Sequence, residues 1–462
     1  MPKSIDDVLV LLPGITGSVL QKNGHDVWAP TPDALAQILM TGAKSLRDLA
    51  LNGDDPEADD LGDGVTATRL VDDVHLIPGL WKIDGYSTTR ARLRAAFDLQ
   101  EGKNYFEFPY DWRRDNRAAA RLLSNKARKW VEDRRKTNPQ ARLVLLAHSM
   151  GGLVARHFLE VLGGWEIART LITFGTPYQG APKALGFVSN GYKMGLGPLS
   201  FDFSDVMLSF TSVYQLLPDY ACYDDGSGAL KHVADAVNVP NLDRKRAADA
   251  RSFHGTIDDA AARRRSGNQD PGYVTYPIVG REQPTWQSGV LRNGGVELLA
   301  QLGGTDSGGD GTVPQVSASP KEQFNDGREM YQPTAHGTLQ AADAVLAHVE
   351  GILDRPSVAP PKYRAPSNKV ALSLRIDDAY RPGPIKVTVR PLDGVRTGLV
   401  AKIEDIASKK AQDYKLPTVL SGGWHEGTTG PLPQGVYRVT VTGGRADGTT
   451  AIAVSDVFAV LG

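Results

Sequence analysis

The stretch Leu143-Val-Leu-Leu-Ala-His-Ser-Met-Gly-Gly152 decides the fold that we expect for this chain. Its apolar first half predicts a fully buried strand, and the residues after it have the apolar spacing of a helix. Between the two, Ser149 lies in a small-residue pentapeptide, an A-x-S-x-G variant of G-x-S-x-G. A strand, a tight turn with serine at its apex and a helix together predict a nucleophile elbow. The alternative interpretation is an ordinary turn that happens to carry a serine.

The composition limits the kinds of protein that the chain can represent. Its 462 residues are too many for one small domain, so we expect a large catalytic domain and one appended domain. An apolar fraction of 41% and a charged fraction of 23% are typical of a soluble globular protein. A formal net charge of −1 gives no long-range attraction to nucleic acid, and no nucleic-acid partner is expected. Cys222 is the single cysteine, so neither a disulfide nor a Cys-rich metal site is expected, and no cofactor is predicted.

The start of the sequence lacks the pattern of a secretory signal peptide. The apolar run 8–12 is too short for the core of such a signal and follows two acidic residues, so it reads better as a first strand. No run approaches the ~20 apolar residues that a membrane-spanning helix needs. We therefore expect a cytoplasmic protein.

Strand and helix patterns alternate along residues 1–354, which predicts an α/β fold, namely an α/β-hydrolase with a parallel sheet covered on both faces. The alternation fails over about 183–267, where we expect a cap or lid insertion. A proline-rich linker follows at 355–367. Residues 368–462 then alternate apolar and polar side chains, which predicts a small all-β sandwich of the immunoglobulin-like kind that binds another protein. The predicted strands of the α/β part are 8–12, 105–108, 142–146, 169–174 and 273–279.

A serine nucleophile needs a base beside it, and the base needs an acid that holds its tautomer. In α/β-hydrolases these residues follow in the order serine, acid, histidine. His336 stands between small residues just before the last predicted helix, so we predict it as the base for Ser149. Asp310, in a glycine-rich loop upstream, is the predicted acid, and Asp306 is the alternative.

Other histidines fit the base less well. His348 lies within the last predicted helix and His254 lies in the insertion. His148 and His157 flank the elbow, at positions that do not match the base, and we expect both to be structural. This leaves His336 as the predicted base.

The loop Pro13-Gly-Ile-Thr-Gly-Ser18 follows the first predicted strand. Its glycines let the backbone turn an N–H group outward, and we expect that of Ile15 to form half of an oxyanion hole. A phosphate-binding loop would need a G-K-[ST] ending, which is missing, and a plain turn is the other alternative. In the insertion, Met194, Phe201 and Phe203 are expected to contact an acyl chain, although such residues are often ordinary core.

The segment 54–63 is strongly acidic. An EF-hand would need a different spacing of carboxylates and a terminal glutamate, so we do not expect a calcium site. We expect a solvated surface loop instead.

Five motifs in one order carry a resemblance to a known family. The chain resembles the lecithin:cholesterol acyltransferase / lysosomal phospholipase A2 family over about residues 8–350, and the C-terminal β-region is not part of the likeness. The motifs are Pro13-Gly-Ile-Thr-Gly-Ser18, Pro109-Tyr-Asp-Trp-Arg113, Ala147-His-Ser-Met-Gly-Gly152, Phe174-Gly-Thr-Pro-Tyr-Gln-Gly180 and Gly309-Asp-Gly-Thr-Val-Pro314. The elbow is shared by many esterases, whereas the first two motifs together are more specific.

The resemblance implies roles for residues of this chain. It implies Ser149 as nucleophile, Asp310 as acid and His336 as base, and it implies that the N–H groups of Ile15 and Met150 form the oxyanion hole. It also implies that Asp111 and Trp112, with Arg113, lie beside the substrate. Secreted animal members use disulfides and membrane-binding lid segments, and because this chain lacks the cysteines, we do not expect lipoprotein cholesterol as its substrate.

The expected function is that of a serine esterase, lipase or acyltransferase that acts on lipid-like acyl esters through an acyl-enzyme. Water or an alcohol would accept the acyl group, and the protein would contact lipid peripherally. Two alternatives remain open. The chain could be a catalytically silent binding protein that uses both domains for recognition, or a thioesterase or peptidase with the same three residues.

Overall fold

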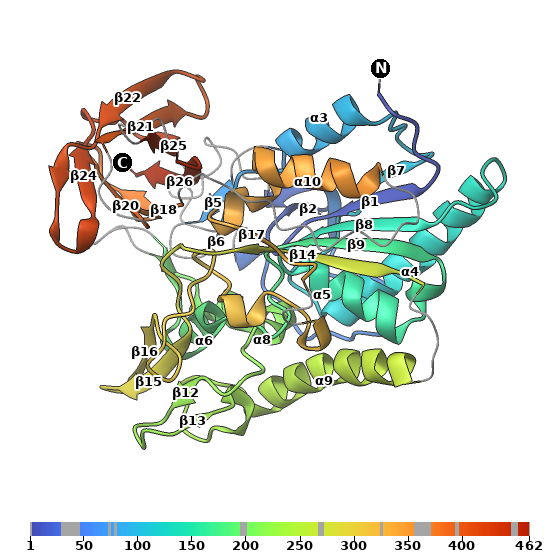
Figure 1. Cartoon of the computed structure of the whole chain (residues 1–462). Coiled ribbons are helices and arrows are strands. Elements are labelled where there is room, and N and C mark those ends of the chain that lie inside the picture. The colour runs from blue at the N-terminus through green and yellow to red at the C-terminus, as the bar shows by residue number, and fades with distance from the viewer. Residues whose placement is uncertain are drawn as a thin grey trace.

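The computed structural model describes residues 2–28, 47–72, 75–77, 81–194, 201–266, 272–323, 327–354, 371–392, 397–444 and 451–461. They form an α/β part and a C-terminal part made of strands, which lies at one side of it near the hairpin β5–β6 (Figure 1). The predicted linker 355–367 falls outside the described residues.

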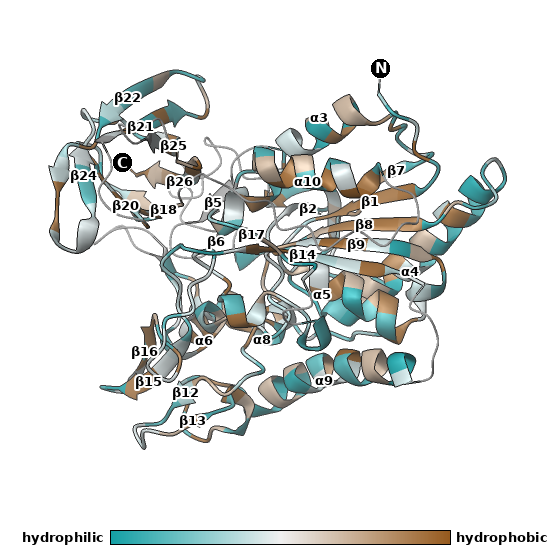
Figure 2. Cartoon of the chain, viewed as in Figure 1, coloured by the Kyte–Doolittle hydropathy of each residue, from teal (hydrophilic) through white to brown (hydrophobic). Residues whose placement is uncertain are grey.

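A six-stranded sheet forms the centre of the α/β part, with the strand order β17-β14-β9-β8-β1-β7 and only parallel neighbours. Strands β1, β8 and β9 are predominantly brown in Figure 2, because a parallel sheet with both faces covered needs apolar residues on both sides. This confirms the predicted fold class. The strands are β1 (Val8–Leu12), β7 (Tyr105–Glu107), β8 (Leu143–His148), β9 (Ala168–Phe174), β14 (Val274–Gly280) and β17 (Met330–Gln332).

Helices cover both faces of this sheet. Alternate side chains of a strand point to opposite faces, so Val8 and Val10 join a core with helices α4 (Asn116–Arg135) and α5 (Gly151–Arg156). Leu9 joins the other core, with α3 (Ser87–Ala96) and α10 (Asp343–Leu353). Because both faces are occupied, the loops at the carboxyl ends of the strands are what remains for a functional site.

The chain between β9 and β14 departs from the alternation of strand and helix, as the sequence predicts. None of its described strands pairs with the central sheet. The hairpin β15–β16, downstream of the predicted insertion, pairs with β12, where Tyr223 lies opposite Gly289. We propose that the cap therefore includes this hairpin besides residues 183–267. The elements are α6 (Pro182–Asn190), β10 (Lys193–Met194), β11 (Phe201–Asp202), α7 (Ser204–Ser209), α8 (Thr211–Gln215), β12 (Tyr223–Asp224), β13 (Leu230–Lys231), α9 (Arg244–Ser266), β15 (Ser288–Arg292) and β16 (Gly295–Leu299).

Smaller elements complete the α/β part. An antiparallel sheet of β3, β2 and β4 follows the first strand of the central sheet, and a 3-10 turn, η7, precedes α10. Their bounds are β2 (Ser18–Lys22), β3 (His25–Trp28), β4 (Val65–Leu70), β5 (His75–Ile77), β6 (Trp81–Ile83) and η7 (His336–Ala341).

The C-terminal part contains two sheets, in the orders β18-β20-β24-β23 and β19-β26-β25-β21-β22. Buried residues of both sheets, among them Val387, Val389, Val439 and Phe458, share one core, so the predicted all-β sandwich is confirmed. The strands are β18 (Leu372–Arg375), β19 (Ala379–Tyr380), β20 (Lys386–Pro391), β21 (Thr397–Asp405), β22 (Ala411–Lys415), β23 (Thr418–Val419), β24 (His425–Thr428), β25 (Gly435–Gly444) and β26 (Val454–Val460).

The acidic segment 54–63 lies at the surface with most of its carboxylates exposed, as the sequence predicts. It also contacts two buried arginines: Arg114 donates to Asp54 Oδ1 at 3.1 Å, and Arg113 donates to Asp63 Oδ2 at 2.9 Å. Arg114 Nη2 also donates to the carbonyl oxygen of Ala58 at 2.9 Å. These contacts were not predicted, because the arginines lie far downstream, where a local charge pattern cannot reveal them.

Candidate active site

Ser149 lies in the turn between β8 and α5, so the predicted sequence of strand, turn and helix is present. Its φ angle is 52°, a region that residues other than glycine rarely adopt. The N–H group of Ser149 donates to the carbonyl oxygen of Phe174 at 2.9 Å, and its own carbonyl oxygen accepts from Thr176 Oγ1 at 2.9 Å. These hydrogen bonds to β9 and the loop after it hold the unfavourable turn in place.

The glycines after the serine are required by close packing. A Cβ atom on Gly151 would lie 2.4 Å from the carbonyl oxygen of Pro13, and one on Gly152 would lie 2.0 Å from Thr176 Oγ1. Both distances are far below van der Waals contact. A larger residue at either position would push the loop after β1 or the loop after β9 away from Ser149.

His336 lies in hydrogen-bond contact with both Ser149 and Asp310. His336 Nε2 is 3.0 Å from Ser149 Oγ, and His336 Nδ1 is 2.7 Å from Asp310 Oδ2. The other carboxylate oxygen of Asp310 accepts from the N–H groups of Thr312 at 2.9 Å and Val313 at 2.7 Å. Because a carboxylate only accepts, this network assigns the ring proton to Nδ1 and leaves Nε2 as an acceptor for the serine hydroxyl.

The loops that carry Asp310 and His336 also contact each other. The N–H group of His336 donates to the carbonyl oxygen of Asp310 at 2.8 Å. Gly175, with φ of 57°, leaves room between them, since a Cβ atom there would lie 2.7 Å from Asp310 Oδ2 and 3.0 Å from His336 Nδ1. The glycine of the motif after β9 is therefore part of how the ring and the carboxylate meet.

The alternative acid and the other histidines have different partners. Asp306 is exposed, and its Oδ1 accepts from Gln287 Nε2 at 2.6 Å. His254 Nε2 is 2.8 Å from the carbonyl oxygen of Gln215, and the ring of His157 stacks on Phe253 with centroids 5.6 Å apart. Of the two predicted acids, Asp310 is the one that the structure brings to His336.

Two residues near the site were missed or undervalued at the level of sequence. Tyr86 Oη accepts from the N–H group of Gly14 at 2.8 Å and lies 2.9 Å from His148 Nδ1. His148 Nε2 lies 3.2 Å from the carbonyl oxygen of His336. Since the Gly14 amide donates, the tyrosine hydroxyl donates to His148, whose Nε2–H then donates to the His336 carbonyl.

His148 is neutral in this chain of hydrogen bonds. Burial, followed by the neighbouring His336, lowers its pKa to about 3. The position of His148 directly before the serine was the available signal for its importance. Tyr86 lies at the end of a turn-rich segment and gave no signal in the sequence.

The loop after β1 approaches the serine closely. A Cβ atom on Gly14 would lie 2.8 Å from Ser149 Cβ, and the turn is closed by a hydrogen bond from Gly17 N–H to the Gly14 carbonyl oxygen at 3.1 Å. Ile15 lies in this turn, and Met150 directly follows the serine. Within the described part of the chain, neither N–H group donates a hydrogen bond. Their role as an oxyanion hole stays a prediction.

The motif Pro109–Arg113 contacts that turn at both of its ends. Tyr110 Oη donates to the carbonyl oxygen of Pro13 at 3.0 Å, and Trp112 Nε1 donates to that of Ser18 at 3.0 Å. Both carboxylate oxygens of Asp111 accept from Arg113, at 2.9 and 2.6 Å. The two specific motifs of the resemblance therefore meet in space.

The predicted substrate contacts have the following surroundings. Trp112 is buried and packs edge-on against Trp28 and Phe210, with ring centroids 5.0 and 5.6 Å away. Phe203 is buried, and its ring centroid is 6.4 Å from that of Tyr192. The side chains of Met194 and Phe201 lie outside the described residues. Contact of Asp111, Trp112 and the three cap residues with substrate stays a prediction.

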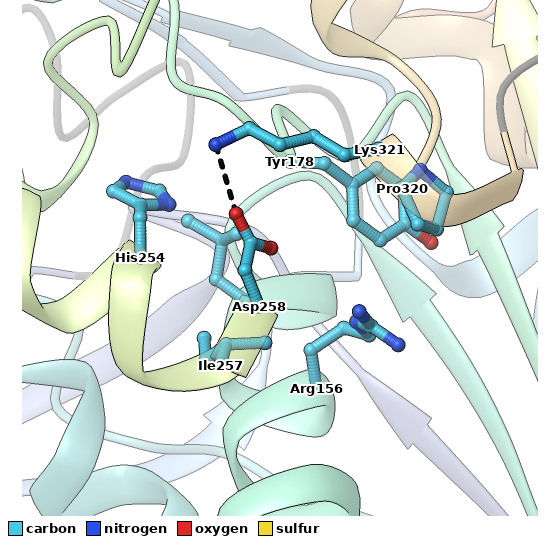
Figure 3. Close-up of a pocket in the computed structure, with 8 residues that line it drawn as sticks. Arg156, Tyr178, His254, Ile257, Asp258, Pro320 and Lys321 are labelled. Carbon is cyan, nitrogen blue, oxygen red and sulfur yellow. Dashed lines mark ion pairs between the residues drawn. The ribbon is translucent and has the colours of Figure 1, made fainter. Parts of the chain in front are cut away.

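A separate pocket is lined by charged side chains (Figure 3), including Arg156, His254, Asp258 and Lys321. Its charges are compensated within the protein, since Lys321 Nζ lies 2.8 Å from a carboxylate oxygen of Asp258. Arg156 pairs with Glu160 at 2.8 Å. A ligand would therefore find no unpaired cation here.

The described residues offer neither a metal site nor a membrane-spanning helix. No group of three or more histidine, cysteine, aspartate or glutamate side chains there could hold a metal ion. None of the described helices combines the length and the apolar character that crossing a membrane requires.

Part of this chain is similar in sequence to known proteins. Residues 82–260 match the family model described as lecithin:cholesterol acyltransferase. "Lecithin-cholesterol acyltransferase-like 4" from Arabidopsis thaliana is 26% identical over 129 residues, which are 26% of this chain and 24% of that protein. The match thus spans about a quarter of the length of this curated relative.

Two solved structures align with low scores. A Bacillus licheniformis lipase in its propeptide form aligns over 99% of this chain and 94% of its own, with 11% identity and a TM-score of 0.31. The product of the Listeria innocua gene lin2722 aligns over 76% of this chain and 95% of its own, with 13% identity and a TM-score of 0.29. Scores this low do not bear on the family.

The matched segment overlaps the motifs that carry the resemblance. Residues 82–260 include the Pro109–Arg113 motif, the elbow and the loop after β9, which are three of the five motifs. The chain has the fold of an α/β-hydrolase, and its residues 82–260 are similar to the lecithin:cholesterol acyltransferase family.

Proposed function

We propose that this protein is a serine esterase, lipase or acyltransferase that transfers the acyl group of lipid-like esters through an acyl-enzyme. The observation that carries the proposal is the continuous hydrogen-bond chain from Ser149 Oγ through the His336 ring to Asp310. The family match of residues 82–260 supports acyl transfer as the reaction class.

In the first half of the reaction, Ser149 Oγ attacks the ester carbonyl carbon while His336 Nε2 takes the hydroxyl proton. The negative charge passes to the carbonyl oxygen, where the N–H groups of Ile15 and Met150 would each lower the barrier by roughly 3 kcal/mol. His336 then gives its proton to the leaving alcohol oxygen as the bond from that oxygen to carbon breaks. Asp310 holds the ring orientation and stabilises its cation.

In the second half, water or another alcohol attacks the acyl-enzyme. His336 takes the proton of the acceptor, and the bond from Ser149 Oγ to the acyl carbon breaks as that proton returns to the serine. The protein thus ends in its starting state. Water as acceptor gives hydrolysis, and an alcohol gives transfer.

The apolar cap supports lipid-like acyl groups over peptides. Phe203, Phe210 and Met207 join the apolar core that also holds Ile15 and Met150, so the cap and the proposed oxyanion turn form one continuous apolar body. A long acyl chain would find apolar contact next to the serine.

The test is the full-length protein with Ser149→Ala, and Ser212→Ala as a matched control. Ser212 is also buried, and within the described part of the chain its hydroxyl has no hydrogen-bond partner, so its loss should cost little. We expect Ser149→Ala to lower turnover by at least about 10⁴-fold and to abolish labelling by a fluorophosphonate. The parent and the control should be labelled and active.

A substrate panel then identifies the ester. Phospholipid, triglyceride, acyl-CoA and peptide are incubated with the parent, with and without a long-chain alcohol, and the products are read by mass spectrometry. The proposal would be overturned if the parent cleaved the peptide and none of the other substrates. It would also be overturned if the folded parent were neither labelled nor active.

A further inference from the structure

The β-sandwich contacts the two loops that carry Asp310 and His336. In Figure 1 the sandwich lies against β5 and β6, and β26 also approaches η7, the turn that begins with His336. Three sets of polar contacts cross this boundary. Each ends within a few residues of the acid or the base.

The first contact is made by Gln283, which is buried in the α/β part. Its side chain pairs with the backbone of β18 in the sandwich, because Nε2 donates to the Leu372 carbonyl oxygen at 3.1 Å and Oε1 accepts from the Leu374 N–H at 3.1 Å. Its own N–H group donates to the carbonyl oxygen of Gly309 at 3.0 Å, and Gln283 pairs with Asp310 in an isolated β-bridge. One glutamine thus joins the first sheet of the sandwich to the acid.

The second contact reaches the base. Thr338 Oγ1, two residues after His336, lies 3.1 Å from the carbonyl oxygen of Ser455 in β26. It lies equally far from the carbonyl oxygen of Ala335, directly before His336, so its O–H is shared between the two. The second sheet of the sandwich therefore contacts the turn that carries the imidazole.

The third contact is an ion pair. Arg438, in β25, pairs with the buried Asp84, and it also lies 3.5 Å from Glu404 Oε2 in β21. The backbone N–H group of Asp84 donates to the carbonyl oxygen of Gly337 at 2.7 Å, directly after His336. A charged group of the sandwich is therefore linked through Asp84 to the residue that follows the base.

We propose that the C-terminal β-sandwich is a positioning element of the active site, which holds the loops of Asp310 and His336 at hydrogen-bond distance from Ser149. Gln283, Thr338 and Arg438 are its positioning residues. The inference rests on the proposed function and deepens it, because it assigns a task to a domain that carries no catalytic group. Buried hydrogen bonds of this kind fix geometry, and small displacements of catalytic groups are costly in rate.

The test uses the full-length protein, since the domains have not been shown to fold separately. Thr338→Val removes the shared hydroxyl at nearly constant volume, and Thr338→Ser restores it. Arg438→Met removes the charged link. Lys386→Met is the control, because it breaks an ion pair with Glu426 that joins two strands of the sandwich to each other.

We expect Thr338→Val and Arg438→Met to lower kcat for a short soluble ester, and the rate of fluorophosphonate labelling, about tenfold each, with KM nearly unchanged. Thr338→Ser and Lys386→Met should keep the parental values. The downfield proton signal of the His336–Asp310 hydrogen bond should shift or broaden in the two impaired variants only.

A separate variant covers the case in which Arg438→Met does not fold. Gln283→Leu removes both hydrogen bonds to β18 without leaving a charge, and we expect the same loss of kcat. If these variants unfold at lower temperature but keep the parental kcat, labelling rate and proton signal, the boundary is only a docking surface and the inference is wrong. A folded parent without labelling or turnover would instead overturn the proposed function.

Discussion

Two buried polar clusters of this protein are each built around a carboxylate and differ in what they can do. Around Glu160, the carboxylate receives hydrogen bonds from Arg156 at 2.8 Å and from Arg264 at 2.8 and 2.9 Å. Burial alone raises the pKa of Glu160, but Arg264 and Arg156 together outweigh it and bring the pKa below its ordinary value. This carboxylate is fixed between cations and has no proton to exchange.

At the other cluster, Asp310 contacts an imidazole and backbone N–H groups in place of guanidinium groups. The ring can accept a proton at Nε2, where Ser149 lies, while the carboxylate keeps it oriented. A buried carboxylate that is paired with arginines therefore supports the structure, whereas one that is paired with histidine next to a hydroxyl supports chemistry. Four variants test this distinction.

The largest effect is expected for Asp310→Asn. An asparagine amide would donate to His336 Nδ1 and favour the wrong tautomer, so kcat should fall about 10³- to 10⁴-fold while the protein stays folded. Asp306→Asn is the control, because that carboxylate is exposed and bonded to Gln287. Steady-state kinetics on a short ester measures both. Equal losses in the two variants would contradict the assignment of the acid.

Glu160→Gln should act on stability. It leaves Arg264 buried without its counter-charge and Arg156 paired with Glu322 alone, which costs about 3–5 kcal/mol of unfolding free energy. Urea titration measures the loss, and the fraction that remains folded should keep the parental kcat. The exposed pair of Glu166 with Arg128 gives the control, Glu166→Gln, which should change little. If Glu160→Gln lowered kcat without lowering stability, the cluster around Glu160 would serve chemistry as well as structure.

His157→Phe should change how stability depends on pH. Burial, followed by the charge of Arg117, lowers the pKa of His157 to about 4 from an ordinary value of 6.5. The unfolded chain therefore binds this proton first as pH falls, so the parent loses stability between about pH 6.5 and pH 4.

Phenylalanine keeps the stacking on Phe253 and cannot be protonated. As the pH falls through this window, the unfolding free energy of His157→Phe should therefore decrease by roughly 3 kcal/mol less than that of the parent. Urea titrations at pH 7, 5.5 and 4 measure the difference. The exposed His25 offers His25→Gln as a control that should follow the parent. Parallel curves for parent and His157→Phe would show that His157 titrates normally.

The smallest effect is expected for Tyr86→Phe. Loss of the Tyr86 hydroxyl leaves the Gly14 N–H group and His148 Nδ1 without their shared partner. We therefore expect kcat to fall about tenfold, which corresponds to a barrier raised by about 1.4 kcal/mol. His148 keeps its contact with the His336 carbonyl, so the triad contacts should survive. Kinetics together with thermal unfolding separates the loss of rate from a loss of fold. A parental kcat would mean that the hydroxyl serves stability alone.

Sequence predicts the parts of this molecule that depend on local order. The apolar run 143–146 and the glycines after Ser149 predict the elbow, because strand, turn and helix each leave a local pattern. The fixed chain order of α/β-hydrolases then led to Asp310 and His336, and the His336 ring does lie in hydrogen-bond contact with both Asp310 and Ser149.

What escaped prediction depends on distant partners. Tyr86 contacts Gly14 and His148 across long stretches of chain, and no local pattern marks a tyrosine whose importance lies in its hydroxyl. The contacts of the acidic segment 54–63 with Arg113 and Arg114 were not predicted for the same reason, since these arginines lie about fifty residues downstream. The sandwich strands were predictable, whereas the meeting of Gln283 with β18 was not.

The φ angle of 52° at Ser149 has an evolutionary consequence. Glycine adopts this conformation without strain, so a lineage that kept the fold only for recognition would gain stability by exchanging the serine for glycine. Without selection for activity, this serine should be replaced early, because glycine at this position makes the protein more stable. A serine at a position where the backbone disfavours it is what selection on its reactivity would produce.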